Sequence, residues 1–236
     1  MATFVLIPGA GGEAWFWHRL VPELEARRHQ AVAVELPSGD DAAGWQQYAD
    51  AIERAMDGLD EQAQDQLVLV AQSLAGFSAP LVADHRRVDL LVLLNGMIPL
   101  PGETGEAWWS NTRQQEAARA YFEQIGLASD GVNDDKVVYF HDVPADVVEE
   151  AFSRGEPQQS WTPMTQPWPL QRWPDVPTRV LAGRNDRLFP LEFQRRVGRE
   201  RLGLEVDEID GGHMAAMSRP TELAERLVDY LKELER

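Results

Sequence analysis

Residues 67–76 read Leu67-Val68-Leu69-Val70-Ala71-Gln72-Ser73-Leu74-Ala75-Gly76, so a serine among small residues ends an apolar run. The apolar run predicts a buried strand, and the pattern of residues 77–85 predicts a helix after it. A serine on a sharp turn from strand to helix needs small neighbours, because the strained backbone brings adjacent elements close. The spacing Ala71-x-Ser73-x-Ala75 is a loose form of this nucleophile elbow. Serine is also a common helix N-cap, so other parts of the chain must decide between the two interpretations.

Further short apolar runs occur at residues 4–7, 31–34, 90–94 and 180–182, with a weaker one at 204–209. All but the last are continuous rather than alternating, which is typical of parallel strands covered on both faces. Helical patterns at residues 15–27 and 45–56 alternate with the early strands, and an amphipathic helix closes the chain at 220–234. This alternation predicts an α/β fold with a mainly parallel sheet of about six strands flanked by helices.

The alternation of strands and helices stops between about residues 96 and 177. Helical patterns occur there at residues 112–124 and 145–153, and turn-rich segments at 99–105 and 128–134. A run rich in proline and tryptophan follows, and no central strand is expected. We therefore expect a helical cap, or lid, at residues 97–165, inserted into a core made of residues 1–96 and 166–236.

Composition limits the classes of function. The chain has 236 residues, of which 44% are hydrophobic and 26% charged, as in an ordinary globular protein. A net charge of −17 without a basic patch argues against a nucleic-acid partner. The absence of cysteine excludes disulfides, a thiolate nucleophile and a zinc–thiolate site. Residues 1–8 read as a strand rather than a signal peptide, and every apolar run is too short for a membrane span. We therefore expect a cytoplasmic protein without a membrane partner. We also expect it to be a monomer or a homodimer.

A serine nucleophile needs a base, and the base needs an orienting partner. Four of the five histidines lie within or just after expected helices, or in the expected cap: His18, His29, His85 and His141. The fifth stands in the glycine-rich loop Asp210-Gly211-Gly212-His213-Met214, between the last strand and the last helix. That position suits a base in the chain order Ser, Asp, His.

Three residues compete for the orienting role. Asp186 follows the strand expected at 179–183, at the end of the strand before the histidine loop. Asp210 is only three positions from His213 and is typical of a turn residue. Asn95 ends the preceding strand but is uncharged, so it cannot stabilise an imidazolium ion as a carboxylate does. The sequence therefore predicts Asp186 as the acid.

The loop Pro8-Gly9-Ala10-Gly11-Gly12 follows the first expected strand. Its glycines allow positive φ, which lets backbone N–H groups turn inward toward a developing oxyanion. We expect the donors to be the N–H groups of Ala10 and Leu74. A tight turn is the simple alternative. A phosphate-binding loop is disfavoured, because neither G-x-G-x-x-G nor a following Lys-Ser/Thr pair is present.

Four motifs taken in order resemble the α/β-hydrolase superfamily, and more narrowly its branch of plant methylesterases and hydroxynitrile lyases. They are the segment 4–17, Ala71-Gln72-Ser73-Leu74-Ala75-Gly76, Gly183-Arg184-Asn185-Asp186 and Gly212-His213-Met214. The resemblance implies the α/β-hydrolase fold with an inserted helical cap. It also implies a catalytic triad of Ser73, Asp186 and His213.

The chain departs from this branch at several positions. Pro8 and Gln72 stand where histidines are usual. Met214 and Gly9 stand where the lyases have a lysine after the base and a threonine in the oxyanion loop. A thioether cannot stabilise departing cyanide as an ammonium group does, so the resemblance favours an esterase over a lyase. Ser73 also argues against the dehalogenases and epoxide hydrolases of the superfamily, which use an aspartate.

The resulting expectation is a serine hydrolase that cleaves a small to medium-sized, largely apolar carboxylic ester, thioester or lactone, with no cofactor and no metal. Further residues expected to contact substrate are Gly9, Gln72, Trp108, Trp161 and Met214. Tryptophans of a lid often pack the lid onto the core instead. The alternatives are a non-hydrolytic enzyme of the same fold, such as an isomerase, cyclase or lyase, and a small-molecule-binding protein with a slow triad.

Overall fold

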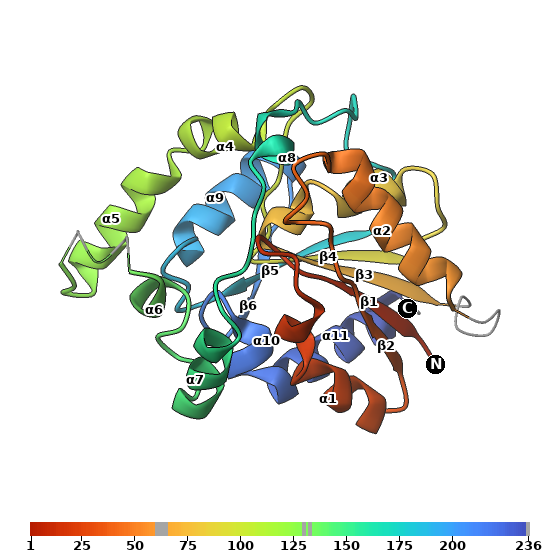
Figure 1. Cartoon of the computed structure of the whole chain (residues 1–236), viewed down its shortest axis with the longest axis horizontal. Helices are drawn as coiled ribbons and strands as arrows, with labels where there is room; N and C mark the ends of the chain where they lie inside the picture. Colours follow the sequence, from red (N-terminus) through yellow and green to blue (C-terminus); the bar gives the residue numbers. More distant parts are fainter. Residues whose placement is uncertain (60–65, 129–130, 132–133, 235–236) are drawn as a thin grey trace.

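A sheet of six parallel strands forms the centre of the molecule (Figure 1). The computed structural model describes residues 1–59, 66–128, 131 and 134–234. The strands are β1 (Thr3–Ile7), β2 (Gln30–Ala33), β3 (Leu67–Gln72), β4 (Leu90–Leu94), β5 (Thr178–Gly183) and β6 (Val206–Ile209). They lie in the order β2-β1-β3-β4-β5-β6, and every neighbouring pair is parallel. The expected sheet is confirmed, and the carboxyl ends of its strands meet at one edge.

Alternate side chains along each strand divide the hydrophobic core into two layers. Val5, Leu69 and Leu91 belong to the layer on one face of the sheet. Phe4 and Val92 belong to the layer on the opposite face. Both layers are covered by helices, which is why the strand sequences are continuously apolar rather than alternating.

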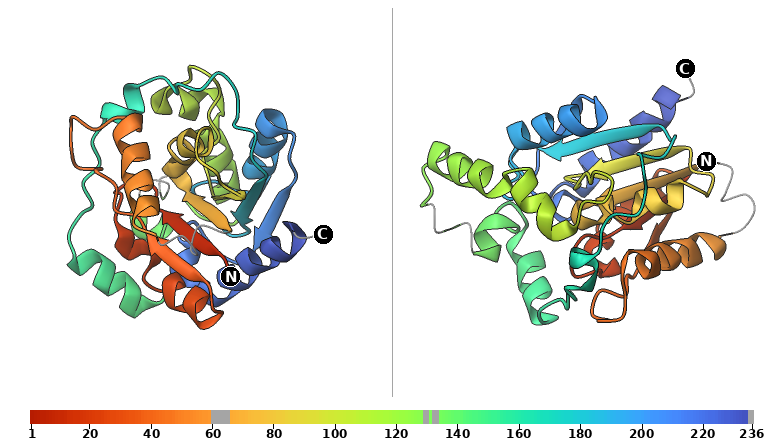
Figure 2. Two further views of the ribbon diagram at one scale, coloured as in Figure 1. Left: turned by 90° about the vertical axis from the view of Figure 1, so that its right-hand side faces the viewer. Right: turned by 90° about the horizontal axis from the view of Figure 1, so that it is seen from above.

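Helices cover each face of the sheet (Figures 1 and 2). The first layer packs against α2 (Trp45–Asp57), α3 (Ala79–Ala83) and α9 (Leu191–Leu202). The second packs against α1 (Leu20–Ala26) and α11 (Pro220–Leu234), with the short α10 (Ala215–Ser218) before α11. Two 3-10 turns, η1 (Ala14–Trp17) and η3 (Ser73–Gly76), follow the first and third strands. Along the described parts of the chain, no helix combines the length and apolarity needed to cross a bilayer.

Two of the expected helices are shorter than their apolar patterns suggested, and each contains a proline. The pattern at residues 15–27 divides into η1 and α1, and Pro22 lies in the first turn of α1. The pattern at residues 77–85 contracts to α3, with Pro80 near its start. Proline lacks an N–H donor and is tolerated only in the first helical turn, so both helices begin shortly before it.

Five helices lie between β4 and β5, and no strand occurs among the described residues of this stretch. They are α4 (Gly105–Asn111), α5 (Gln114–Gln124), α6 (Asp135–Val138), α7 (Ala145–Ser153) and α8 (Thr162–Thr165). We call residues 97–165 the helical segment. Figure 1 shows its helices α4 to α7 beyond the carboxyl ends of the strands. Of the turn-rich stretch expected at 128–134, residues 129–130 and 132–133 lie outside the described residues.

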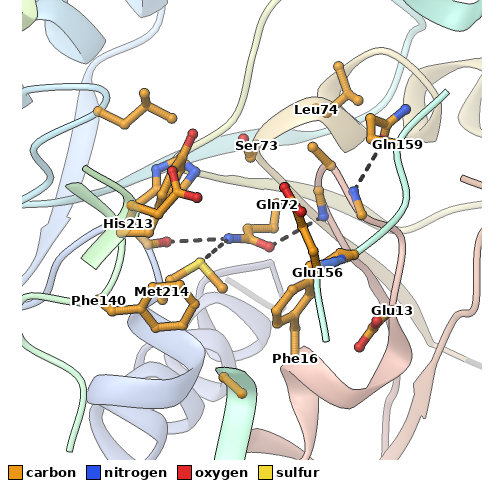
Figure 3. Close-up of a pocket in the computed structure, with 18 of the residues that line it drawn as sticks. Glu13, Phe16, Gln72, Ser73, Leu74, Phe140, Glu156, Gln159, His213 and Met214 are labelled. Atoms are coloured by element: carbon orange, nitrogen blue, oxygen red, sulfur yellow. Dashed lines mark hydrogen bonds between the residues drawn. The ribbon is translucent and has the colours of Figure 1, made fainter. Parts of the chain in front are cut away.

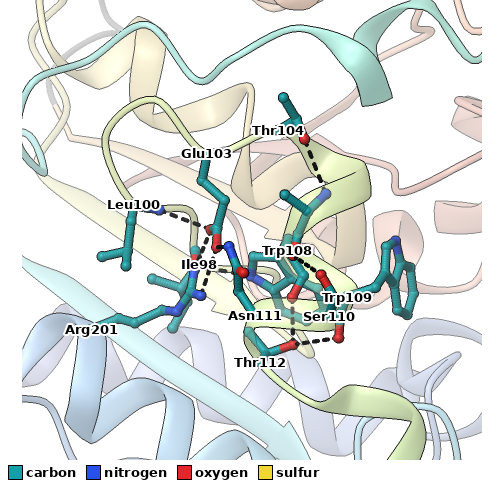
Figure 4. Close-up of polar contacts among 11 residues, drawn as sticks. Ile98, Leu100, Glu103, Thr104, Trp108, Trp109, Ser110, Asn111, Thr112 and Arg201 are labelled. Atoms are coloured by element: carbon teal, nitrogen blue, oxygen red, sulfur yellow. Dashed lines mark hydrogen bonds and ion pairs between the residues drawn. The ribbon is translucent and has the colours of Figure 1, made fainter.

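The chain enters and leaves the helical segment at one place. Gly102 N–H donates to Trp168 O at 3.0 Å, and Trp168 N–H donates to Glu103 O at 2.9 Å. Glu103 also forms a buried ion pair with Arg201 of α9, with Nη1–Oε2 2.5 Å and Nη2–Oε1 2.9 Å (Figure 4). Because both oxygens are engaged, this pair fixes the start of the segment to the core in a defined geometry.

Candidate active site

Ser73 stands at the junction of β3 and η3 with a positive φ of 51°. A left-handed backbone is strained for serine, and strain of this kind is typical of a nucleophile elbow. A Cβ on Gly9 would lie 2.9 Å from Ser73 Cβ, and one on Gly76 would lie 1.8 Å from Met97 O. The close packing around the elbow therefore requires glycine at position 76 and leaves little room for a side chain at Gly9.

His213 and Asp186 form a buried pair at the carboxyl edge of the sheet. His213 Nδ1 lies 2.8 Å from Asp186 Oδ2, and the exposed fractions of the two residues are 2% and 0%. Asp186 Oδ1 accepts the backbone N–H groups of Leu188 and Phe189 at 2.8 and 2.9 Å. These bonds fix the carboxylate, so it can hold one orientation of the imidazole and leave Nε2 for other contacts.

Ser73 and His213 both line one cavity of about 710 Å³ (Figure 3). The structure thus brings together the three side chains that the sequence predicted from separate loops: two on the cavity wall and Asp186 behind them. The competing acid Asp210 is exposed and accepts Asn185 Nδ2 at 3.0 Å instead. Three of the other histidines lie elsewhere: His18 stacks on Trp15, His29 accepts Ala2 N–H, and His85 contacts Glu53.

Asn95 holds the histidine loop, a role that the sequence did not indicate. Its Nδ2 donates to Gly212 O and His213 O, both at 3.1 Å, and its Oδ1 accepts Gly183 N–H at 2.6 Å. Asn95 is fully buried and has a φ of 45°, a conformation that asparagine tolerates better than most residues. The sequence did contain one sign of this role, because a polar residue, Asn95, directly follows the fully apolar run 90–94.

Gln72 connects the glycine loop after β1 to the histidine loop. Its Oε1 accepts Gly9 N–H at 3.3 Å, and its Nε2 lies 3.4 Å from His213 O and 3.5 Å from Met214 Sδ. Gly9, Gln72 and Met214 line the cavity, as expected for groups near a substrate.

The N–H groups of Ala10 and Leu74 are available to a ligand. Both residues line the cavity beside Ser73. Within the described residues, neither N–H donates to a protein acceptor. The neighbouring Gly11 and Gly12 have φ values of 85° and 64°, and Gly11 N–H donates to Gln159 Oε1 at 3.0 Å. Two free donors near one hydroxyl are the arrangement that an oxyanion requires.

The cavity walls are mainly aromatic and apolar. The aromatic lining residues are Trp15, Phe16, Trp109, Tyr139, Phe140, Phe152 and Trp161. Trp161 is 58% exposed at the surface and contributes to the lining as expected. Trp108 does not: its ring is fully buried against Phe189 and Phe193. The expectation that Trp108 contacts substrate is therefore wrong. Its neighbour Trp109 lines the cavity and can make this contact instead.

Residues of the helical segment also reach the histidine loop. Tyr139 meets the His213 ring edge to face, with ring centres 5.5 Å apart, and burial raises the pKa of Tyr139 to about 12. Asp142 Oδ2 accepts Gly212 N–H at 2.7 Å, and burial lowers the pKa of His141.

Among the described residues, no cluster of His, Asp and Glu side chains is arranged to hold a metal ion.

Comparison with known proteins identifies the family of the chain. A model of the alpha/beta hydrolase family matches residues 4–226. The chain belongs to the alpha/beta hydrolase family. Alpha-hydroxynitrile lyase of Arabidopsis thaliana is 25% identical to this chain, with 97% of this chain and 98% of the relative covered. Methylesterase 3 of the same plant is 25% identical, over 51% of this chain and 49% of its own.

Solved structures share the fold of this chain. The crystal structure of polyneuridine aldehyde esterase matches with a TM-score of 0.78 at 21% identity, covering 98% of this chain and 99% of that one. The expected α/β-hydrolase fold is confirmed, and so is the resemblance to the branch of methylesterases and hydroxynitrile lyases.

Proposed function

We propose that this α/β-hydrolase cleaves carboxylic esters through an acyl-enzyme on Ser73. The observation that carries the proposal is one cavity lined by a strained serine, a carboxylate-oriented histidine and two free backbone donors. Relatives named as a methylesterase and an aldehyde esterase support the same class of reaction. Hydrolysis of this kind needs no metal or organic cofactor.

In the proposed mechanism, Ser73 Oγ attacks the ester carbonyl while His213 Nε2 takes its proton. Asp186 holds the imidazole through Nδ1 and stabilises the imidazolium ion. The N–H groups of Ala10 and Leu74 donate to the oxyanion of the tetrahedral intermediate. His213 then returns the proton to the departing alkoxide, which leaves as the alcohol. Water, deprotonated by His213, attacks the acyl carbonyl and releases the acid and free Ser73.

The walls of the cavity suggest its substrates. A volume of about 710 Å³ accommodates a small to medium-sized molecule. Aromatic and apolar side chains dominate the lining, so we propose a largely apolar ester, with thioesters and lactones as chemically related substrates. Residues 97–165 supply several of these side chains, and we propose that they act as the cap of the site.

Cyanohydrin cleavage is the competing proposal, because one relative is named as an alpha-hydroxynitrile lyase. Met214 stands directly after His213 and its sulfur contacts Gln72 Nε2. It brings no positive charge to stabilise a departing cyanide ion. We therefore expect ester hydrolysis to exceed cyanide release from a cyanohydrin such as mandelonitrile, measured on the same preparation.

A series of p-nitrophenyl esters of rising acyl length tests the proposed function. We expect turnover of the shorter esters, and a loss of at least about a thousandfold in kcat for Ser73→Ala. Ser78→Ala is the matched control, because Ser78 is a buried serine of the same region whose hydroxyl donates to Ala75 O at 3.4 Å, and the residue does not line the cavity. Equal turnover by Ser73→Ala and the parent protein would contradict the mechanism. Tight binding of an ester without turnover would favour the small-molecule-binding alternative.

A further inference from the structure

Tyr139 is held in place beside His213 from both sides along the chain. Before it, Arg187 Nη1 donates to Val137 O at 2.9 Å. After it, Asp142 Oδ2 accepts the N–H of Gly212, the residue next to His213 in the chain, at 2.7 Å. The tyrosine is thus fixed relative to the histidine loop, although it belongs to the helical segment.

The orientation of His213 places Tyr139 next to the reacting centre. The imidazole meets Tyr139 at 5.5 Å and 66°, and Phe189 at 5.3 Å and 84°, between ring centres. Its Nδ1 is engaged by Asp186, which leaves Nε2 for the cavity that Tyr139 also lines. A substrate group beside the reacting ester therefore comes close to Tyr139.

The Tyr139 hydroxyl differs from the two amide side chains of the cavity wall, which both make hydrogen bonds within the protein. The Gln72 amide contacts Gly9 and the histidine loop. The Gln159 amide contacts Gly11 and the Tyr48 hydroxyl. Within the described residues, the Tyr139 hydroxyl has no hydrogen-bond partner. Burial raises the pKa of Tyr139 to about 12, so the phenol is protonated at neutral pH, as an ordinary tyrosine is, and can donate a hydrogen bond.

We propose that Tyr139 is a specificity-determining residue, whose hydroxyl donates to an acceptor oxygen on the substrate beside the reacting ester. The substrate class would then be esters with an ether, carbonyl or hydroxyl oxygen next to the ester group. A donor left unpaired when a hydrocarbon chain fills the cavity costs free energy, so plain hydrocarbon esters are selected against. The inference rests on the proposed ester hydrolysis at Ser73.

Two esters of nearly the same shape test the inference. In p-nitrophenyl methoxyacetate an ether oxygen replaces one methylene group of p-nitrophenyl butyrate. The ratio of kcat/KM for the two esters is measured in the parent protein and in Tyr139→Phe. Intrinsic differences in reactivity cancel when the two ratios are compared. We expect the methoxyacetate preference to fall about tenfold in Tyr139→Phe, the size of one hydrogen bond.

Tyr121→Phe is the matched control, because Tyr121 lies in α5 of the same segment and does not line the cavity. Its ratio should equal that of the parent protein. An unchanged ratio in Tyr139→Phe, an equal fall in Tyr121→Phe, or an equal loss on both esters in Tyr139→Phe would overturn the inference. Thermal unfolding of Tyr139→Phe verifies the fold. Failure of the proposed function itself is distinguishable, because the parent protein would then hydrolyse neither ester.

Discussion

Asn95 connects the histidine loop to the end of β5. Its side chain makes hydrogen bonds to Gly183, Gly212 and His213 in a fully buried setting. Asn95→Ala leaves these groups unpaired and places alanine at positive φ, so we expect the free energy of unfolding to fall by about 3 kcal/mol. Urea denaturation measures the change. Asn185→Ala, which removes one exposed hydrogen bond to Asp210, should lower the free energy of unfolding by less than about 1 kcal/mol. Equal losses in the two variants would contradict a structural role of the Asn95 side chain.

Gly76 gives a second prediction at the scale of one residue. A Cβ at this position would lie 1.8 Å from Met97 O, a clash that only movement of the backbone can relieve. We expect Gly76→Ala to lower the free energy of unfolding by about 3 kcal/mol or more. Gly58→Ala is the control, because its nearest backbone atoms would be 3.6 Å away. A neutral Gly76→Ala in denaturant unfolding would show that the elbow is not closely packed.

The order of residues along the chain predicted Ser73, Asp186 and His213, because each follows a recognisable strand. It could not predict the hydrogen bonds of Asn95, which join residues 88, 117 and 118 positions apart. Nor could it distinguish Trp108 from Trp109, because which one faces the cavity depends on the rotation of α4. Contacts set by tertiary packing therefore required the structure.

At the scale of elements, the central strands were the easiest to predict. Buried on both faces, they carry continuous apolar runs, and β4 matches its predicted bounds. The other strands differ from their predicted runs by one or two residues at an end, and the edge strands β2 and β6 are also less buried. No bounds were predicted for helix α9, because Leu191–Leu202 carries six arginine and glutamate side chains among few apolar ones.

The ion pair between α9 and the helical segment gives a prediction for these elements. Glu103→Ala leaves Arg201 buried without its partner, and we expect a loss of about 3–5 kcal/mol in the free energy of unfolding. The double variant Glu103→Leu with Arg201→Leu should recover most of it, because no buried charge remains. Glu205→Ala, which breaks a fully exposed pair with Arg199, is the control and should change the free energy of unfolding far less. Equal losses of unfolding free energy in Glu103→Ala and Glu205→Ala, measured by denaturant unfolding, would contradict the proposal that the Glu103–Arg201 pair anchors the helical segment to α9.

At the scale of the whole molecule, the net charge of −17 should affect which substrates arrive. A negative surface potential repels anionic esters at low ionic strength and is screened by salt. We expect kcat/KM for the monomethyl ester of glutaric acid to rise severalfold between about 10 and 150 mM salt. The neutral methyl pentanoate should show little change. Parallel salt profiles for the two esters would rule out charge steering.

Covalent labelling by a fluorophosphonate probe tests the central claim most directly. Such a probe reacts with a serine that is activated by a histidine, as we propose for Ser73 and His213. We predict one adduct per chain, located on Ser73 by tandem mass spectrometry, and its loss in Ser73→Ala and His213→Ala. Ester hydrolysis that continues with Ser73 unlabelled, or with the adduct on another residue, would contradict the account.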